Sequence, residues 1–200
     1  MDIPANAAFM AVRKVIALDV QYANRVARSM GFRHFPAANF THSIVVNGAD
    51  ILDGVAAIPV FPAEENGEKD AARVQATQRC QHSLQDAGFR TLLAPAKCTP
   101  ELRPDGRPVL KHSDDQYLMI NVLLTCMRLR PQFVVLVAGD GDYAPLVWAL
   151  REEGMRTEVV ADPYSLAADL RRAAYSSTSL RDILRAIPAN NGMHPAIAAA

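Results

Sequence analysis

The feature that most constrains this 200-residue chain is a β-branched apolar run that stops at two closely spaced carboxylates. The run Val134 to Ala138 leads into Gly-Asp-Gly-Asp, and an amphipathic stretch begins at Tyr143. A strand that passes directly into a helix is the building unit of a parallel α/β sheet, whose strands open onto the ligand crevice at their carboxyl ends. Asp140 and Asp142 at such an end predict oxygen ligation of a divalent metal ion.

The rest of the chain alternates short apolar runs with stretches of helical periodicity. The expected strands are Val15 to Asp19, Val55 to Phe61, Phe89 to Ala94, Phe133 to Ala138 and Arg156 to Ala161. The expected helices are Tyr22 to Met30, Asp70 to Asp86, a buried Asp115 to Leu129, Tyr143 to Glu153 and Leu166 to Ala174. This alternation predicts an α/β fold with three α/β/α layers, built on a Rossmann-like, mostly parallel sheet of about five strands.

Three segments fit the pattern less well. Phe32 to Asp53 contains a short β-like piece, Ser43 to Val46, and is otherwise unassigned. Pro59 interrupts its strand, which favours an edge position or a bulge. Pro95 to Pro108 is rich in proline and contains an Asp-Gly pair, so we expect an extended loop with a turn.

Composition limits the classes of protein that this chain can represent. Half of the residues are hydrophobic, which is enough for one sizeable core, so we expect one domain over residues 1–188 and a flexible tail over 189–200. The 21 basic and 21 acidic side chains cancel. Bulk electrostatic capture of nucleic acid is therefore not expected, although a local basic rim is compatible with zero net charge.

The cysteines and the N-terminus indicate a reducing, aqueous compartment. Cys80, Cys98 and Cys126 are far apart and lack histidine at ligand spacing, so we expect small buried residues rather than a zinc or disulfide site. The first ten residues do not resemble a signal peptide, and no run reaches the ~18 apolar residues of a membrane span. We expect a cytoplasmic protein that does not contact membranes. Glycine-rich nucleotide-binding motifs are also missing, so no nucleotide cofactor is expected.

Carboxylates occur at two further places where a strand ends or a helix begins. Asp19 ends the first expected strand, and Asp114 and Asp115 begin a helix. If the first and central strands are neighbours, Asp19 and Asp140 face one crevice. Acids gathered there would repel one another, and bound Mg²⁺ or Mn²⁺ would remove that conflict and assist attack on a phosphate ester. The predicted metal ligands and catalytic residues are Asp19, Asp115, Asp140 and Asp142.

Each acid also has an ordinary structural role open to it. Asp19 and Asp114 are good helix caps, and capping is the simpler explanation of either residue taken singly. Capping explains only one member of the pair Asp140 and Asp142. Asp114 and Asp115 remain rivals for the position of metal ligand.

Several segments resemble NYN domains, the LabA-like branch of the PIN-like nuclease superfamily. Val137 to Leu146 resembles their signature of a strand, Gly-Asp-Ser/Gly-Asp-Phe/Tyr and a Pro-Leu or Pro-Val helix start. Leu150 to Val160 is similar to their next helix, glycine and strand, and Lys111 to Asp115 to their Lys-x-x-Asp helix start. The resemblance spans roughly Val15 to Ile183 and is poor between Phe32 and Asp53.

The resemblance implies a metal-dependent endoribonuclease that hydrolyses RNA phosphodiester bonds with Mg²⁺ or Mn²⁺, leaves a 5′-phosphate and is often a homodimer. It favours Asp115 over Asp114, because Leu118 and Asn121 then fall in register. The substrate-binding positions that it implies are Asn24, Lys111 and Asn121.

Two departures from the family pattern support a second hypothesis. Tyr22 stands where the family usually has asparagine, with Asn24 nearby, and Asn121 stands where a second acid is usual. The alternative is a catalytically inert NYN-type module that binds RNA or a partner protein. A phosphatase that uses Asp140 and Asp142 is disfavoured, because no threonine follows the pair.

Two other features have both a functional and a structural interpretation. We expect Trp148 in the core rather than as a platform for base stacking. The basic residues after the first strand could hold phosphates or form solvated helix faces. They are Arg25, Arg28, Arg33 and His34.

Overall fold

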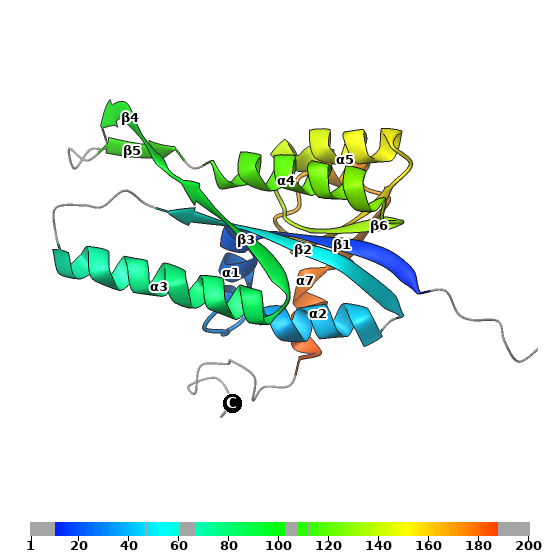
Figure 1. The fold of residues 1–200 in the computed structure, drawn as a ribbon, viewed down its shortest axis with the longest axis horizontal. Helices are drawn as coiled ribbons and strands as arrows, with labels where there is room; N and C mark the ends of the chain where they lie inside the picture. The colour runs from blue at the N-terminus through cyan, green and yellow to red at the C-terminus, as the bar shows by residue number, and fades with distance from the viewer. Residues whose placement is uncertain (1–10, 47, 61–66, 103–107, 112, 188–200) are drawn as a thin grey trace, which may run out of the picture.

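The computed structural model describes residues 11–46, 48–60, 67–102, 108–111 and 113–187, which form one parallel sheet between two layers of helices (Figure 1). The sheet strands are β1 (Val12–Asp19), β2 (Ala49–Val60), β3 (Phe89–Pro95), β6 (Phe133–Val137), β7 (Arg156–Ala161) and β8 (Ser176–Ser179). A separate antiparallel ribbon pairs β4 (Lys97–Leu102) with β5 (Pro108–Lys111). The helices are α1 (Val20–Ser29), α2 (Ala37–Val46), α3 (Gly67–Asp86), α4 (Asp114–Leu129), the 3₁₀ turn η1 (Gly141–Tyr143), α5 (Ala144–Glu152), α6 (Ala168–Ala173) and α7 (Leu180–Arg185).

The strand order places a topological switch point at the centre of the sheet. The order is β3-β2-β1-β6-β7-β8, and every neighbouring pair is parallel. The chain therefore moves outward from β1 to β3 and then restarts on the other side of β1 with β6. Leu18 pairs with Val137, so β1 and β6 end at the same level. Ligand crevices of open α/β sheets lie at this position, beyond the carboxyl ends of the strands.

Helices cover both faces of the sheet. Helices α1, α2, α3 and α7 lie on one face, and α4 and α5 lie on the other (Figure 1). Right-handed crossovers explain this arrangement, because the connections on the two sides of the switch point run in opposite directions along the sheet. Helix α4 consequently begins above the end of β1, where the predicted acids are found.

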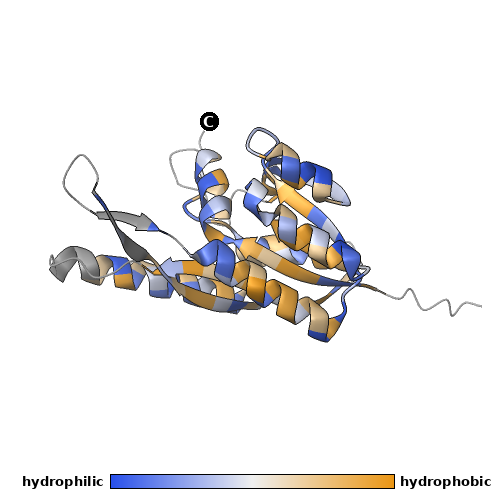
Figure 2. Cartoon of the chain, turned by 90° about the horizontal axis from the view of Figure 1, so that it is seen from above, coloured by the Kyte–Doolittle hydropathy of each residue, from blue (hydrophilic) through white to orange (hydrophobic). Residues whose placement is uncertain are grey.

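The core lies along the central strands. Residues 15–18 of β1 are fully buried, and residues 134–137 of β6 are at most 1% exposed. Because helices cover both faces, these strands are continuous apolar runs rather than alternating ones. Figure 2 shows that hydrophobic residues, in orange, gather along strands of the sheet.

The predicted α/β fold is confirmed, with six strands in the main sheet instead of about five. The additional strand is β8, an edge strand of serine and threonine that is mostly exposed and has no apolar pattern. The β-like piece predicted at Ser43 to Val46 is wrong, because these residues complete α2, which packs through Ala37 and Phe40.

Two predictions based on proline are also corrected. Strand β2 is an interior strand rather than an edge. The pairing of β2 with β1 ends at Ala57, so Pro59 does not have to donate an N–H to β1. The only register shift between β1 and β2 lies at the other end of the pair, near Lys14. The expected loop from Pro95 to Pro108 instead contributes the β4–β5 ribbon.

Helix α4 is buried on one face only, because Ile120 and Leu124 are 59% and 63% exposed. Cys126 is buried and Cys80 is half-buried. The predicted tail, residues 189–200, and the side chain of Cys98 lie outside what the structure describes. Within the described ranges, every helix is too short or too polar to cross a membrane.

Candidate metal centre

Asp19 lies at the switch point and also caps a helix. It is the last residue of β1, directly after the fully buried Leu18. Its Oδ1 accepts a 2.9 Å hydrogen bond from the backbone N–H of Tyr22 and thereby caps α1. Capping and metal ligation were alternative interpretations of this residue. The structure shows that the cap is formed while the carboxylate still faces the other acids.

Asp114 and Asp115 approach Asp19 from the start of α4. One carboxylate oxygen from each of the three residues lies within 4.8 Å of the other two. Asp114 is only 4% exposed, and its Oδ2 accepts a 2.9 Å hydrogen bond from Nε2 of Gln21. Its Oδ1 is buried with no hydrogen-bond partner among the described residues. A buried carboxylate oxygen without a partner is costly, and a bound cation would satisfy it.

Tyr143 joins the Gly-Asp-Gly-Asp segment to α4. Its side chain is 1% exposed, and its hydroxyl donates a 2.6 Å hydrogen bond to Oδ1 of Asp115. Burial raises the pKa of Tyr143, so the phenol stays protonated and remains a donor. The hydrogen bond fixes the carboxylate of Asp115 relative to the loop after β6.

Asp140 and Asp142 follow the neighbouring strand β6, and both are exposed. Oδ1 of Asp140 accepts a 3.1 Å hydrogen bond from the backbone N–H of Asp142 and caps η1. Neither residue belongs to the group of three oxygens within 4.8 Å. Their charges nevertheless reach Asp115, because both raise its pKa.

Burial and mutual repulsion of the acids favour either their protonation or the binding of a cation. Burial raises the pKa of Asp19 from 3.8 to about 6, and the charges of Asp115 and Asp114 add to the rise. The Tyr22 N–H and the Arg25 guanidinium lower it, but by less. Burial also raises the pKa of Asp115, although its bond from Tyr143 opposes the shift. Oxygen donors under such repulsion suit a hard divalent cation such as Mg²⁺ or Mn²⁺.

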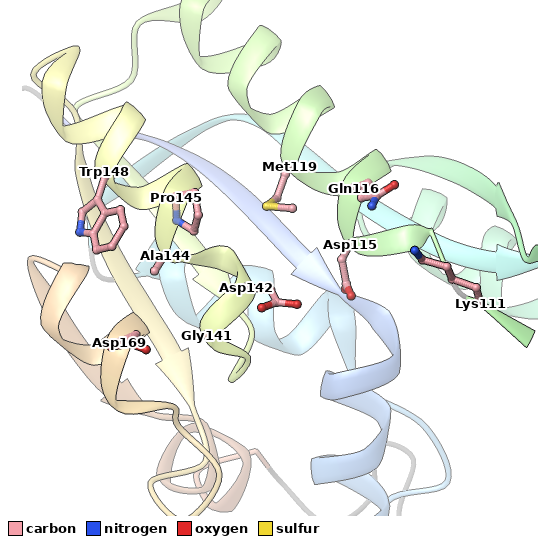
Figure 3. A pocket seen from close by; sticks show the side chains of 10 residues that line it. All are labelled: Lys111, Asp115, Gln116, Met119, Gly141, Asp142, Ala144, Pro145, Trp148 and Asp169. Atoms are coloured by element: carbon pink, nitrogen blue, oxygen red, sulfur yellow. The ribbon is translucent and has the colours of Figure 1, made fainter.

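A pocket of about 560 Å³ opens beside the acids, between the starts of α4 and α5 (Figure 3). In Figure 3, Asp115 from α4 and Asp142 from η1 face each other, and Lys111 points toward them. The residues that line the pocket are Lys111, Asp115, Gln116, Met119, Gly141, Asp142, Ala144, Pro145, Trp148 and Asp169.

Comparison with known protein families shows which family the chain belongs to. The model of the NYN domain matches residues 22–181. The chain belongs to the NYN domain family. NYN domains are a PIN-like nuclease family, and an acidic cluster at the switch point is compatible with nuclease activity.

One solved structure supports the fold of this NYN domain. A protein of unknown function from Vibrio parahaemolyticus is 18% identical, with a TM-score of 0.59, and the match covers 92% of this chain and 98% of that one. MurG from Acinetobacter baumannii is 12% identical, with a TM-score of 0.43, and the match covers 84% of this chain and 41% of that one. The first match shows a shared fold. The search of curated proteins found no match.

The NYN domain brings only some of the predicted substrate residues to the pocket. Lys111 lines it. Oδ1 of Asn24 instead accepts a 2.8 Å hydrogen bond from the Phe35 N–H, beside a separate pocket that Arg28 also lines. Asn121 accepts a 3.3 Å hydrogen bond from Arg90 and donates to the Tyr117 carbonyl.

Tyr22, the main departure from the family pattern, has a structural role in this NYN domain. It is 3% exposed, and its hydroxyl accepts a 2.8 Å hydrogen bond from the Asp162 N–H and lies 3.0 Å from Oγ of Ser165. Its ring occupies the space over Gly139, where an added Cβ would lie 2.4 Å from Cε2. Tyrosine at this position therefore packs the loop after β6 against α1.

Sequence alone missed two residues of the site and misplaced a third. Gln21 and Tyr143 hold the acids, yet neither residue type signals such a role by itself. Trp148 is 51% exposed and lines the pocket, so its expected core position is wrong. The helical spacing of Ala144 and Trp148, four residues apart, places both on one side of α5, but spacing alone does not show that this side carries the pocket.

Proposed function

We propose that this NYN domain is a metal-dependent endoribonuclease that hydrolyses RNA phosphodiester bonds at the acidic crevice. The observation that supports this most strongly is the convergence of Asp19, Asp114 and Asp115, together with the buried oxygen of Asp114 that has no hydrogen-bond partner among the described residues. The sequence signature after β6 further supports assignment to the LabA-like branch of the family.

The residues proposed to hold the cation are Asp19 and Asp115, with Asp114 as a third ligand. This arrangement extends the prediction from sequence, in which Asp114 and Asp115 were rivals, because the two side chains reach the same group of oxygens. Asp140 and Asp142 complete the proposed site from the other strand. A bound Mg²⁺ or Mn²⁺ would supply charge neutralisation at the phosphate and a more acidic water.

The remaining chemistry belongs to the side chains of this chain. Lys111, on the pocket wall, would hold a phosphate oxygen of the substrate. Asp142 is exposed and faces Asp115 across the pocket (Figure 3), so it can accept a proton from the attacking water. Tyr143 keeps Asp115 oriented through its hydroxyl donor. A phosphodiester in the pocket would thus contact both the bound cation and Lys111.

Cleavage of a fluorescent single-stranded RNA tests the proposal. Wild-type protein should cleave it with Mg²⁺ or Mn²⁺ and stop when EDTA is added. Asp140→Asn preserves the cap on η1, since asparagine caps as well as aspartate, and should abolish cleavage without unfolding the protein. Asp182→Asn is the matched control, because Asp182 is an exposed acid that pairs with Arg185 outside the pocket.

The proposal fails if Asp140→Asn cleaves at the wild-type rate. RNA binding without cleavage by the metal-loaded wild type would instead favour the inert RNA-binding module.

A further inference from the structure

The pocket beside the acids has two chemically different ends. Asp115, Asp142 and Lys111 form one end, and Figure 3 shows Trp148 at the other, with Pro145 between Trp148 and the acids. Met119, Ala144 and Pro145 also line the pocket, together with the carboxylate of Asp169. Asp169 forms an ion pair with Arg172, which balances its charge.

Local structure explains why the aromatic and apolar side chains share one wall. Trp148 follows Pro145 by three residues and Ala144 by four, so its side chain lies beside both of them on α5. Asp115 and Met119 are likewise four residues apart on α4. Helix α4 therefore contributes a carboxylate at its start and an apolar side chain one turn further along, and α5 contributes apolar and aromatic side chains to the same pocket.

Trp148 has no packing reason to lie on this wall. Its side chain is 51% exposed, whereas Leu146, Val147 and Leu150 of the same helix are at most 4% exposed and form the core face. A large aromatic ring left half-exposed beside polar groups is more typical of a binding surface than of a core.

We propose that Trp148 stacks on a nucleobase of single-stranded RNA, next to the phosphate held at the acids. This inference rests on the proposed nuclease function and adds a subsite to it. A nucleotide matches the two ends of the pocket, because it has a flat uncharged base at one end and a charged phosphate at the other. The volume of about 560 Å³ lies within the ~300–1,000 Å³ usual for such ligands.

The subsite selects unpaired RNA. A base can lie flat on an indole only after it has left its neighbours in a helix, and aromatic platforms tolerate every base because each has a π-face. The structure thus assigns Trp148 to selection of single strands over duplexes, with little preference for sequence.

The chain offers a direct test, because Trp148 is its only tryptophan. The binding experiment uses the Asp140→Asn protein with Mg²⁺, because this variant should not cleave the RNA. Asp140 is also not one of the described residues that line the pocket. A uridine octamer should quench the tryptophan fluorescence over the same concentration range in which the anisotropy of labelled octamer rises. An octamer with abasic sites should bind without that quenching.

Substitutions extend the test to affinity and turnover. Trp148→Ala should weaken octamer binding roughly 5- to 100-fold, and Trp148→Phe, which keeps a ring, should weaken it less. In the cleaving protein the same substitutions should raise KM for single-stranded RNA more than they lower kcat. Tyr164→Ala is the control, because Tyr164 is 91% exposed and is not a pocket-lining residue among those described; its octamer affinity should be unchanged.

The outcomes separate the two proposals. If the octamer binds and is cleaved while the fluorescence stays constant and Trp148→Ala binds like its parent, the stacking subsite is overturned and the nuclease function stands. If the wild type neither binds nor cleaves the octamer, both proposals are overturned.

Discussion

The hydroxyl of Tyr143 donates a 2.6 Å hydrogen bond to Oδ1 of Asp115, and it connects the loop after β6 to the start of α4. These residues are 28 positions apart in sequence. The contact makes the geometry of the candidate metal centre depend on a buried phenol that touches no substrate in the proposed reaction.

Tyr143→Phe should weaken Mn²⁺ binding about tenfold, a cost typical of losing a residue that orients a ligand. The substitution removes the donor that lowers the pKa of Asp115, so the carboxylate is both less fixed and more often protonated. Calorimetric titration with Mn²⁺ measures the change. Tyr175→Phe, at a half-exposed ring packed on Phe133, is the control. Equal affinities of the two variants would show that Tyr143 does not position Asp115.

The metal-free protein should lose stability as the pH rises from about 4 to above 6. Asp19 has its pKa raised from 3.8 to about 6 in the folded state, so the folded protein holds a proton that the unfolded chain releases. The free energy of unfolding should fall by up to about 3 kcal/mol over this window, at about 1.4 kcal/mol for each pH unit of the shift. Urea denaturation in EDTA at pH 4 and pH 7.5 measures it. A rise in stability over the same range would contradict the account.

Asp19→Asn should stabilise the metal-free protein at pH 7.5 by ~1–3 kcal/mol. Asparagine keeps the cap on α1 and removes a charge that burial and two neighbouring acids oppose. The same variant should lose most of the rise in melting temperature that Mn²⁺ gives the wild type. A destabilised variant that still responds fully to Mn²⁺ would mean that Asp19 acts only as a helix cap.

Gly139→Ala should destabilise the fold by about 1–3 kcal/mol, as overpacking of a buried site does. Its Cβ would lie 2.4 Å from the ring of Tyr22, which two polar contacts hold in place. Gly141→Ala is the matched control, because the nearest atom to its Cβ is 3.5 Å away and neither glycine has a positive φ. Urea midpoints of the two variants compare them. A Gly139→Ala variant as stable as Gly141→Ala would show that the loop has room to shift.

The strands that carry the site could be predicted because burial on both faces makes them continuous apolar runs. Residues 15–18 and 134–137 are such runs, and each ends at an acid, so the edge of the sheet with the crevice was visible in the sequence. Strand β8 could not be predicted, because its serine and threonine side chains are mostly exposed and its extended backbone depends on pairing with β7.

The details of the site depended on contacts between distant segments. Sequence alone left Asp114 and Asp115 as alternatives, since it could not show that both approach Asp19. The position of Asn121 was also beyond sequence, because its side chain is held by Arg90, 31 residues away. Trp148 could not be distinguished from a core residue without knowing which face of α5 meets the sheet.

The central claim is that the acids at the switch point bind a divalent cation. Calorimetric titration with Mn²⁺ of the wild type, Asp115→Asn and Asp182→Asn tests it most directly. Saturable binding should occur in the wild type and in Asp182→Asn, and should be at least about tenfold weaker in Asp115→Asn, which loses a charged ligand. Equal Mn²⁺ affinity in all three proteins, or no binding to the wild type, would contradict the claim.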